Sequence, residues 1–265
     1  MSTFDPTAED REGLRQVFSC IDNTTLEGCD TKEKVSALCH RSLALQDSSL
    51  GIAPVAAICV YPVFVRQVRR ELEGSGIKVA SVAGAFPSGQ SPLFIKLQEI
   101  KYAIDEGADE IDMVISRGAF LEGDEQRVFD EVAAIRQLVD GRYQETFDEI
   151  SELKSVCSAH DVTLKVILET GELQTRDNIV RVSQLAIDAG ADFIKTSTGK
   201  IAVSATLEAA DAMLQTIKNH FEKTNKMVGF KAAGGISTPE EVLKYYQLYK
   251  DIIGEEYVNK QYFRK

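Results

Sequence analysis

The sequence predicts an α/β protein that forms a single (β/α)8 barrel, also called a TIM barrel, over residues 1–265. From Val17 onward, short apolar or β-branched runs alternate with longer amphipathic segments, which is the pattern of repeated βα units around a parallel sheet. The length of 265 residues fits the roughly 250 residues that one such barrel needs. Gly- and Pro-containing breaks at 86–92 and 234–235 are too short to link separate domains, so we expect one domain.

About seven complete βα units can be assigned. The strands are expected in the short apolar runs near 18–22, 56–61, 79–83, 110–115, 163–169, 193–197 and 228–231. The helices are expected in the amphipathic segments at about 31–46, 63–73, 93–106, 124–159, 175–188, 205–222 and 238–253. Thr31, Thr175 and Thr238 are the expected N-caps, and Pro239 follows the last of them at a position that favours helix initiation.

Four charged residues interrupt the apolar strands, namely Asp112, Lys165, Lys195 and Lys231. A buried ion costs several kcal/mol even after the protein relaxes, so an unpaired buried lysine usually shifts its pKa instead of staying ionised. Lysines that lose their proton readily are candidate nucleophiles. The pattern therefore indicates a catalytic centre inside the barrel.

Strand phase groups three of these residues. Asp112, Lys195 and Lys231 each lie about three residues into their strands, so all three can point into one interior layer. Consecutive units place Lys195 and Lys231 on adjacent strands about 4.8 Å apart, where two ammonium groups repel each other and one titrates low. A neutral amine can attack a carbonyl and form a Schiff base, an electron sink for breaking a carbon–carbon bond, with Asp112 helping to transfer protons.

Two structural interpretations compete with this one. The lysines could pair with Asp112 and Glu169 as internal salt bridges, or the assigned strand phase could be wrong and the lysines could extend outward to water. The position of three lysines near the C-terminal ends of strands favours an active site, because barrel active sites form there.

Glycine-rich turns follow two of the strands, at 197–200 and 233–237, and both precede helices. Exposed backbone N–H groups and helix N-termini bind phosphate at such places, although each turn alone is also compatible with a plain connection. Together, at positions where barrels often bind phosphate, the turns favour a sugar phosphate.

Composition argues against several other classes of function. The net charge of -11 disfavours nucleic acid and anionic membranes as partners, and no apolar stretch approaches the length of a membrane span. The five cysteines lack CxxC spacing and are expected to be reduced, and the chain start has no leader pattern, so we expect a cytoplasmic location.

Metal and nucleotide sites lack a sequence signal as well. His40, His160 and His220 are isolated, so no metal is expected, and no nucleotide-binding glycine motif occurs. Cys59 reads as a core thiol and not as a nucleophile, since no histidine has a recognisable pairing with it.

At this point the motifs resemble the deoxyribose-phosphate aldolase family. The resemblance runs in order over nearly the whole chain, through Asp-Asn-Thr-Thr-Leu at 22–26, Cys-Val-Tyr-Pro at 59–62, Gly-Ala-Asp-Glu-Ile-Asp at 107–112, Leu-Lys-Val-Ile-Leu-Glu-Thr-Gly at 164–171, Asp-Phe-Ile-Lys-Thr-Ser-Thr-Gly-Lys at 192–200 and Gly-Phe-Lys-Ala-Ala-Gly-Gly at 229–235. It implies a class I, cofactor-free aldolase, a carbon–carbon lyase of the aldehyde-lyase class, that reversibly cleaves 2-deoxy-D-ribose 5-phosphate to D-glyceraldehyde 3-phosphate and acetaldehyde. Such an enzyme serves the catabolism of deoxyribose phosphate and nucleosides.

The resemblance also implies roles for individual residues. Lys195 would form the Schiff base, Lys231 would lower its pKa, and Asp112 would take part in proton relay. Residues implied near the substrate are Lys165, Glu169, Thr196, Gly199, Lys200, Gly234 and Gly235. The implied partners are phosphorylated sugars and aldehydes, and a homodimer is compatible with the sequence.

Two departures from the family pattern affect these expectations. The family usually has proline where this chain has Ala232. It also continues after a pair like Phe263-Arg264 into a Gly-Ala-Ser-type phosphate loop and a last helix, whereas this sequence stops at Lys265. We therefore expect a truncated eighth strand, no final helix and an incomplete phosphate site. Two other functions stay open, a sugar-phosphate isomerase with Glu169 as its base and a non-catalytic barrel that binds phosphosugars.

Overall fold

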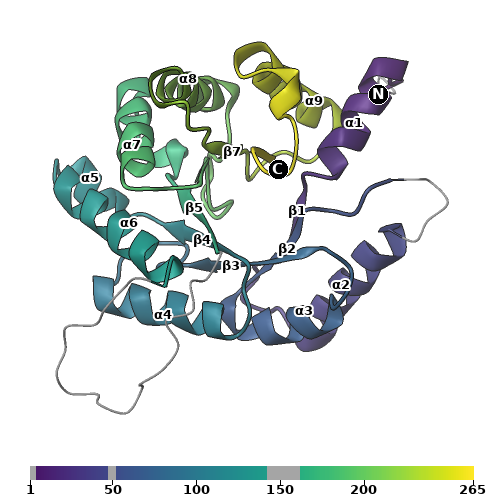
Figure 1. Cartoon of the computed structure of the whole chain (residues 1–265), viewed down its shortest axis with the longest axis horizontal. Coiled ribbons are helices and arrows are strands. Elements are labelled where there is room, and N and C mark those ends of the chain that lie inside the picture. Colours follow the sequence, from purple (N-terminus) through teal and green to yellow (C-terminus); the bar gives the residue numbers. More distant parts are fainter. Residues whose placement is uncertain (1–3, 47–51, 142–161) are drawn as a thin grey trace.

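Eight parallel strands follow one another in sequence order around a barrel, with helices outside them (Figure 1). This computed structural model describes residues 4–46, 52–141 and 162–265. The strands are β1 (Asp22–Thr24), β2 (Ala57–Val60), β3 (Lys78–Ala83), β4 (Glu110–Val114), β5 (Thr163–Ile167), β6 (Phe193–Lys195), β7 (Gly229–Lys231) and β8 (Phe263–Arg264). The predicted fold class is confirmed.

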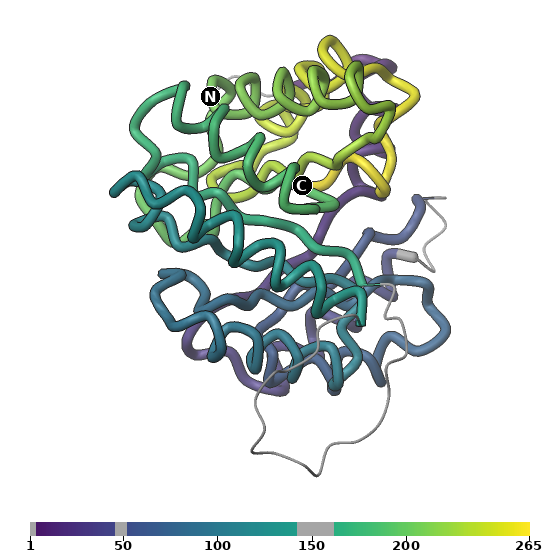
Figure 2. Tube along the Cα trace, turned by 60° about the vertical axis from the view of Figure 1, so that its left-hand side comes forward, coloured from purple at the N-terminus to yellow at the C-terminus, as the bar shows by residue number. Residues whose placement is uncertain are grey.

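The described helices enclose these strands, and α1 packs beside α9, so elements from the two ends of the sequence adjoin (Figures 1 and 2). The α-helices are α1 (Ala8–Phe18), α2 (Lys32–Gln46), α3 (Val65–Glu71), α4 (Leu93–Asp105), α5 (Arg117–Leu121), α6 (Glu125–Val139), α7 (Arg176–Asp188), α8 (Leu207–Thr224) and α9 (Pro239–Ile252). Short 3-10 turns are η1 (Pro62–Phe64), η2 (Thr170–Glu172) and η3 (Glu255–Tyr257). None of these described helices is both long and apolar enough to cross a membrane.

The three predicted N-caps are confirmed. Thr31 Oγ1 accepts a hydrogen bond from the backbone N–H of Lys34 at 3.2 Å, and Thr175 Oγ1 caps α7 in the same way. Thr238 and Glu241 form a reciprocal capping box at the start of α9, where Pro239 is the first helical residue. Each cap satisfies an N–H group that the helix itself leaves without a partner.

The predictions were wrong at the first strand and missed two helices. The apolar residues Val17 and Phe18 belong to α1, which a capping box between Thr7 and Asp10 initiates, and β1 begins only at Asp22. The short helix α5 was missed too. Of the helix predicted over 124–159, α6 covers the first part, and residues 142–161 lie outside the described residues.

The predicted eighth strand is present and contains two residues. Phe263 and Arg264 are in register with Phe230 and Lys231 of β7. The backbone N–H of Lys265 donates to Cys20 O at 3.1 Å, and the N–H of Asp22 donates to Lys265 O at 2.8 Å. These bonds join β8 to β1 and bring the two ends of the sheet together.

Two different environments lie on the two sides of the strands. Outward-facing strand residues pack with the helices in one large apolar core. Inside the barrel, β2 and β3 present a small apolar group made by Ala57, Cys59, Ala80 and Val82. The small side chains of this group leave interior space for the long charged side chains of the opposite strands.

Candidate active site

A cluster of buried charged side chains fills the barrel interior opposite β2 and β3. Its members come from β1, β4, β5, β6, β7 and β8, and each residue is at most 5% exposed. They are Asp22, Glu110, Asp112, Lys165, Lys195, Lys231 and Arg264.

Asp112 lies at the centre of this cluster. Its Oδ2 accepts hydrogen bonds from Lys195 Nζ and Lys231 Nζ, both at 2.7 Å, and its Oδ1 accepts one from Lys165 Nζ at 2.9 Å. Lys195 and Lys231 are register partners on β6 and β7, as strand phase predicted. One carboxylate therefore connects all three interior lysines.

The three lysines have unequal numbers of carboxylate partners. Lys165 Nζ also contacts Glu110 at 2.5 Å and Asp22 at 3.2 Å, and Lys231 Nζ contacts Asp22 at 2.5 Å. Within the described cluster, Lys165 therefore pairs with three carboxylates, Lys231 with two and Lys195 with only Asp112.

This unequal pairing separates the pKa values of the lysines. Burial is the largest influence on each and disfavours the charged form. For Lys195, burial and the ammonium of Lys231 outweigh the attraction of Asp112, so its pKa lies below the ordinary 10.5. For Lys231 and Lys165, the attraction of several carboxylates outweighs burial, and the pKa is raised.

The carboxylates of the cluster are held in their ionised form. Burial alone would raise the pKa of Asp112 and of Asp22. The surrounding cations outweigh burial, with Lys165 contributing most to both, and each pKa falls below its ordinary value. Asp112 is therefore a charged hydrogen-bond acceptor at neutral pH.

A cavity of about 410 Å³ opens where the strands end, and it brings the lysines together with the predicted glycine turns. The predicted site residues that line it are Lys195, Lys231, Gly199, Lys200, Gly234 and Gly235. Thr198 lines it too, and Lys200 Nζ is 2.8 Å from Glu27 Oε1 at its rim. Both glycine turns thus lie at the same cavity as Lys195 and Lys231.

The two glycine turns approach each other closely. Gly234 has φ of +83°, and a Cβ there would lie 2.6 Å from Ser204 Cβ and 3.0 Å from the Cα of Gly199. Any larger residue at 234 would force the turns apart. The backbone of both turns therefore lines this side of the cavity at Gly199 and Gly234.

Thr196 and Glu169 occupy other positions than the cavity lining. Thr196 Oγ1 accepts a bond from the N–H of Ala233 at 3.0 Å, which ties the end of β6 to the turn after β7. Glu169 accepts bonds from the hydroxyl of Thr198 at 2.5 Å and from its N–H at 3.1 Å. Lys165 lies deeper in the barrel, below the cavity-lining residues.

The structural alternatives from the sequence are decided by these contacts. The interior lysines do pair with Asp112, but their other partners are Asp22 and Glu110, and Glu169 bonds to Thr198. The alternative in which the lysines reach outward to water is wrong, because all are buried.

Sequence reasoning missed three members of the cluster. Glu110 lies two residues before Asp112 and so shares its face of β4, a signal that strand alternation already contained. Asp22 was missed because the apolar run before it was assigned to the strand, whereas that run belongs to α1, and Arg264 comes from a strand of only two residues, too few to reveal a phase. Arg264 donates to Asp22 Oδ1 at 2.5 Å and to Glu110 Oε1 at 2.6 Å.

Other candidate groups contribute little to this site. Cys59 is buried, and burial raises the pKa of its thiol to about 11, in agreement with the prediction of a core thiol. Cys20, Cys29 and Cys39 are free thiols. No group of His, Cys, Asp or Glu in the described part of the chain has the arrangement of a metal site. Cys157 and His160 lie outside the described residues.

Comparison with known proteins identifies the family. The model of the DeoC/LacD family aldolases matches residues 17–140 and 136–247. The chain belongs to this aldolase family. It is 39% identical to the human deoxyribose-phosphate aldolase over 95% of this chain and 76% of that protein, and 40% identical to the mouse enzyme with the same coverage.

Solved structures of the family have the same fold. A structure from Toxoplasma gondii ME49 matches with a TM-score of 0.79 and 25% identity over 97% of this chain and 93% of that one. The tetrameric deoxyribose phosphate aldolase of Aeropyrum pernix matches with a TM-score of 0.70 and 24% identity over 98% and 94% of the two chains. This second likeness supports the barrel fold of the family member described here.

Proposed function

We propose that the chain is a class I aldolase that reversibly cleaves 2-deoxy-D-ribose 5-phosphate to D-glyceraldehyde 3-phosphate and acetaldehyde through a Schiff base on Lys195. One observation carries the proposal. Of the buried lysines in the described cluster, Lys195 lines the cavity, has a single carboxylate partner and has a lowered pKa. It is therefore the lysine most readily available as a neutral nucleophile.

The first half of the reaction forms the covalent intermediate. The lone pair of Lys195 Nζ attacks C1 of the open-chain sugar, and loss of water from the carbinolamine gives a protonated imine. The positive charge of the imine develops within hydrogen-bond distance of Asp112, whose Oδ2 lies 2.7 Å from Lys195 Nζ. A carboxylate already held in its ionised form stabilises that charge without rearrangement.

The second half breaks the carbon–carbon bond. Removal of the proton from the C3 hydroxyl lets the C2–C3 electron pair move into the imine, which releases glyceraldehyde 3-phosphate and leaves an enamine. Protonation at C2 and hydrolysis of the imine then release acetaldehyde. Asp112 Oδ2 bonds to Lys195 Nζ and Lys231 Nζ at 2.7 Å each. Asp112 and Lys231 would therefore hold the proton from the C3 hydroxyl and return a proton to C2.

The phosphate would bind at the glycine turns. Backbone N–H groups around Gly199 and Gly234 and the ammonium of Lys200 lie on one side of the cavity, and both kinds of donor favour phosphate. In this assignment, Thr196 positions the turn after β7, while Lys165 and Glu169 support the polar interior. Nothing in the contacts of Glu169 favours the isomerase alternative, since its carboxylate is occupied by Thr198.

Reductive trapping tests the proposed nucleophile. Treatment with acetaldehyde and borohydride should add one ethyl group to Lys195, because only an imine is reduced to a stable secondary amine. Peptide mapping by mass spectrometry locates the adduct. The buried Lys96, which pairs with Glu131 outside the cluster, serves as an internal control and should stay unmodified. An adduct only on Lys231 would reverse the role assignment, and a folded chain with no lysine adduct would refute the mechanism.

Metal independence provides a second test. Because the imine supplies the electron sink, activity should survive exhaustive EDTA treatment within experimental error. The measurement is kcat/KM before and after chelation, with zinc and magnesium added back separately. A loss that one metal restores would contradict a purely lysine-based mechanism.

A further inference from the structure

The buried cluster contains unequal numbers of acids and bases. The acids are Asp22, Glu110 and Asp112, and the bases are Lys165, Lys195, Lys231 and Arg264. Full ionisation would therefore leave one surplus positive charge in an interior where each member is at most 5% exposed. A surplus buried charge is costly, so the cluster is most stable when one base is neutral.

The other described groups near the cluster add no further ion pair to it. From β2, Cys59 faces it as a thiol whose pKa burial raises to about 11, so it is neutral at pH 7. From β3, the residues on the same side are the apolar Ala80 and Val82. Glu169 is buried too, but its carboxylate accepts hydrogen bonds from Thr198 and forms no described ion pair with the lysines. The charges with the largest influence on Lys195 are those of Asp112 and Lys231.

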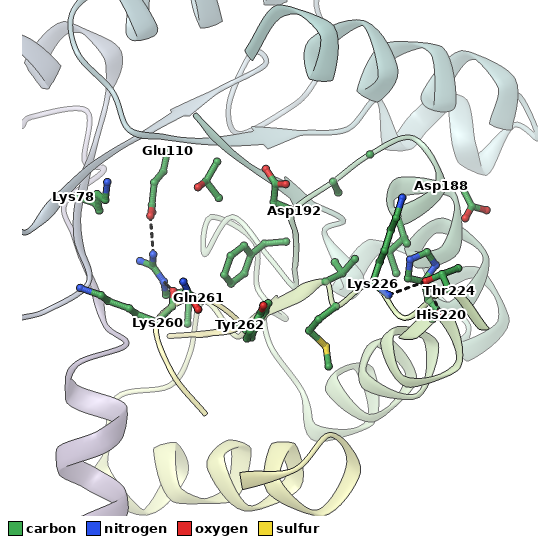
Figure 3. Close-up of a pocket in the computed structure, with 18 residues that line it drawn as sticks. Lys78, Glu110, Asp188, Asp192, His220, Thr224, Lys226, Lys260, Gln261 and Tyr262 are labelled. Carbon is green, nitrogen blue, oxygen red and sulfur yellow. Dashed lines mark hydrogen bonds and ion pairs between the residues drawn. The ribbon is translucent and has the colours of Figure 1, made fainter. Parts of the chain in front are cut away.

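Arg264 is the base of the cluster that has no direct contact with Asp112, the carboxylate partner of Lys195. With Glu110 it lines a second cavity of about 890 Å³. This cavity lies at the starts of the strands, at the opposite end of the barrel from the cavity with the glycine turns. Figure 3 shows Glu110 among its lining residues. Arg264 Nε donates to Lys260 O at 2.6 Å, so all three of its donor directions are fixed. A guanidinium does not lose its proton in proteins, so this charge is permanent.

The remaining charges around this second cavity are poorly placed to replace Arg264. Lys78, Asp188, Asp192, Lys226 and Lys260 are exposed, so water and salt screen them (Figure 3). Arg264 is therefore the charged base through which this end of the barrel acts on the interior cluster.

We propose that Arg264 is a positioning residue that keeps Lys195 available as a neutral amine by permanently balancing the carboxylates of Asp22 and Glu110. With Arg264, Lys165 and Lys231 charged, three cations balance three carboxylates, and a Lys195 ammonium would be the surplus charge. The effect passes from Arg264 to Asp22, from Asp22 to Lys231 and from Lys231 to Asp112, through contacts of 2.5, 2.5 and 2.7 Å. The inference rests on the proposed function, in which Lys195 is the nucleophile.

Substitutions that remove the charge of Arg264 or of Glu110 should shift the pH midpoint of Lys195 in opposite directions. Arg264→Met leaves an unbalanced carboxylate that a protonated Lys195 would balance, so the pH midpoint for neutral Lys195 should rise. The expected rise is about one unit, the order of size by which a changed charge in the protein interior shifts a pKa. Glu110→Gln removes an acid and should lower that midpoint. The double substitution restores the balance and should return the midpoint close to that of the unmodified chain.

The midpoint can be measured without aldolase chemistry. Cyanate carbamylates neutral amines, so its rate of reaction with Lys195, followed by peptide mapping across pH, reports the amine directly. The pH profile of kcat/KM should shift in parallel. Arg264→Lys keeps the charge and should keep the midpoint, whereas Lys96→Met removes a buried cation outside the cluster and should leave the midpoint unchanged. Thermal unfolding of each variant verifies that it is folded.

The outcomes distinguish this inference from the proposed function. Opposite shifts in Arg264→Met and Glu110→Gln with recovery in the double variant support it. If Arg264→Met does not fold, the downward shift in Glu110→Gln alone remains a test. Shifts in the same direction, or no shift in either folded variant, would overturn it. Trapping of acetaldehyde on Lys195 in the unmodified chain tests the proposed function separately.

Discussion

Replacing Lys195 with methionine should lower kcat/KM for 2-deoxy-D-ribose 5-phosphate by about 10⁴-fold or more, because Lys231, the other described interior lysine that lines the cavity, has a raised pKa and stays protonated. Release of glyceraldehyde 3-phosphate in a coupled assay measures this loss. Folding should be preserved, since the substitution removes the one base that exceeds the carboxylates of the cluster and keeps a side chain of similar length. The loss should persist at every pH.

Lys231→Met is the matched comparison. It removes the other amine that bonds to Asp112 Oδ2, but it leaves the nucleophile in place and Asp22 without one of its cations. Lys195 should then take up a proton to balance the cluster, so activity should fall at neutral pH and recover in part as the pH rises. A Lys195→Met variant that recovers in alkaline buffer, or one that retains more than about 1% of kcat/KM, would contradict the role given to Lys195.

Strand periodicity explains why the centre of the site could be predicted. Asp112 and Lys165 lie on five-residue strands, and Lys195 lies in an apolar run whose neighbours fix its phase. Alternation then decides which side chains point inward. Glu110 was available from the same argument, because it stands two residues before Asp112 on β4.

The rest of the cluster depends on tertiary structure. Asp22 and Arg264 come from strands of three and two residues at opposite ends of the sequence, and they meet only because backbone bonds join Lys265 to Cys20 and Asp22. Glu169 shows a different limit. It would continue the inward phase of β5, but its backbone turns to φ of +59° and directs the carboxylate toward Thr198. The alternation of side chains along single strands predicts neither how the ends of the sheet meet nor where a strand turns away from its regular conformation.

The first strand shows how a capping signal can override an apolar run. Val17 and Phe18, with Cys20 and Ile21 after them, resemble the start of a strand, and that was the prediction. Thr7 and Asp10 form the capping box that begins a helix ten residues earlier, and Val17 becomes part of its buried face. The Thr-x-x-Asp pattern was readable in the sequence, so this error came from ranking hydrophobicity above the helix start signal.

Asp112→Asn should lower the free energy of unfolding by about 3–5 kcal/mol at neutral pH, because it breaks a buried ion cluster from one side and leaves cations without their shared partner. Urea denaturation measures the change. Asp105→Asn is the control, since Asp105 forms an exposed pair with Lys101 and its loss should cost about 0–1 kcal/mol. Equal effects of the two substitutions would show that the cluster contributes no more to stability than a surface pair.

The pH dependence of that difference follows from the sign of the pKa shift. In the folded chain, the three lysines around Asp112 outweigh burial and hold its pKa well below the ordinary 3.8. The stabilisation is therefore fully present above pH 3.8 and is lost as the pH falls through the lower folded-state value. The variant lacks this titration, so the two unfolding free energies should stay apart from neutral pH down to about pH 4 and converge below it. A difference that instead disappears between pH 7 and pH 5 would mean that Asp112 is protonated in the folded chain, and it would remove Asp112 as the charged group that shares protons with Lys195 and Lys231.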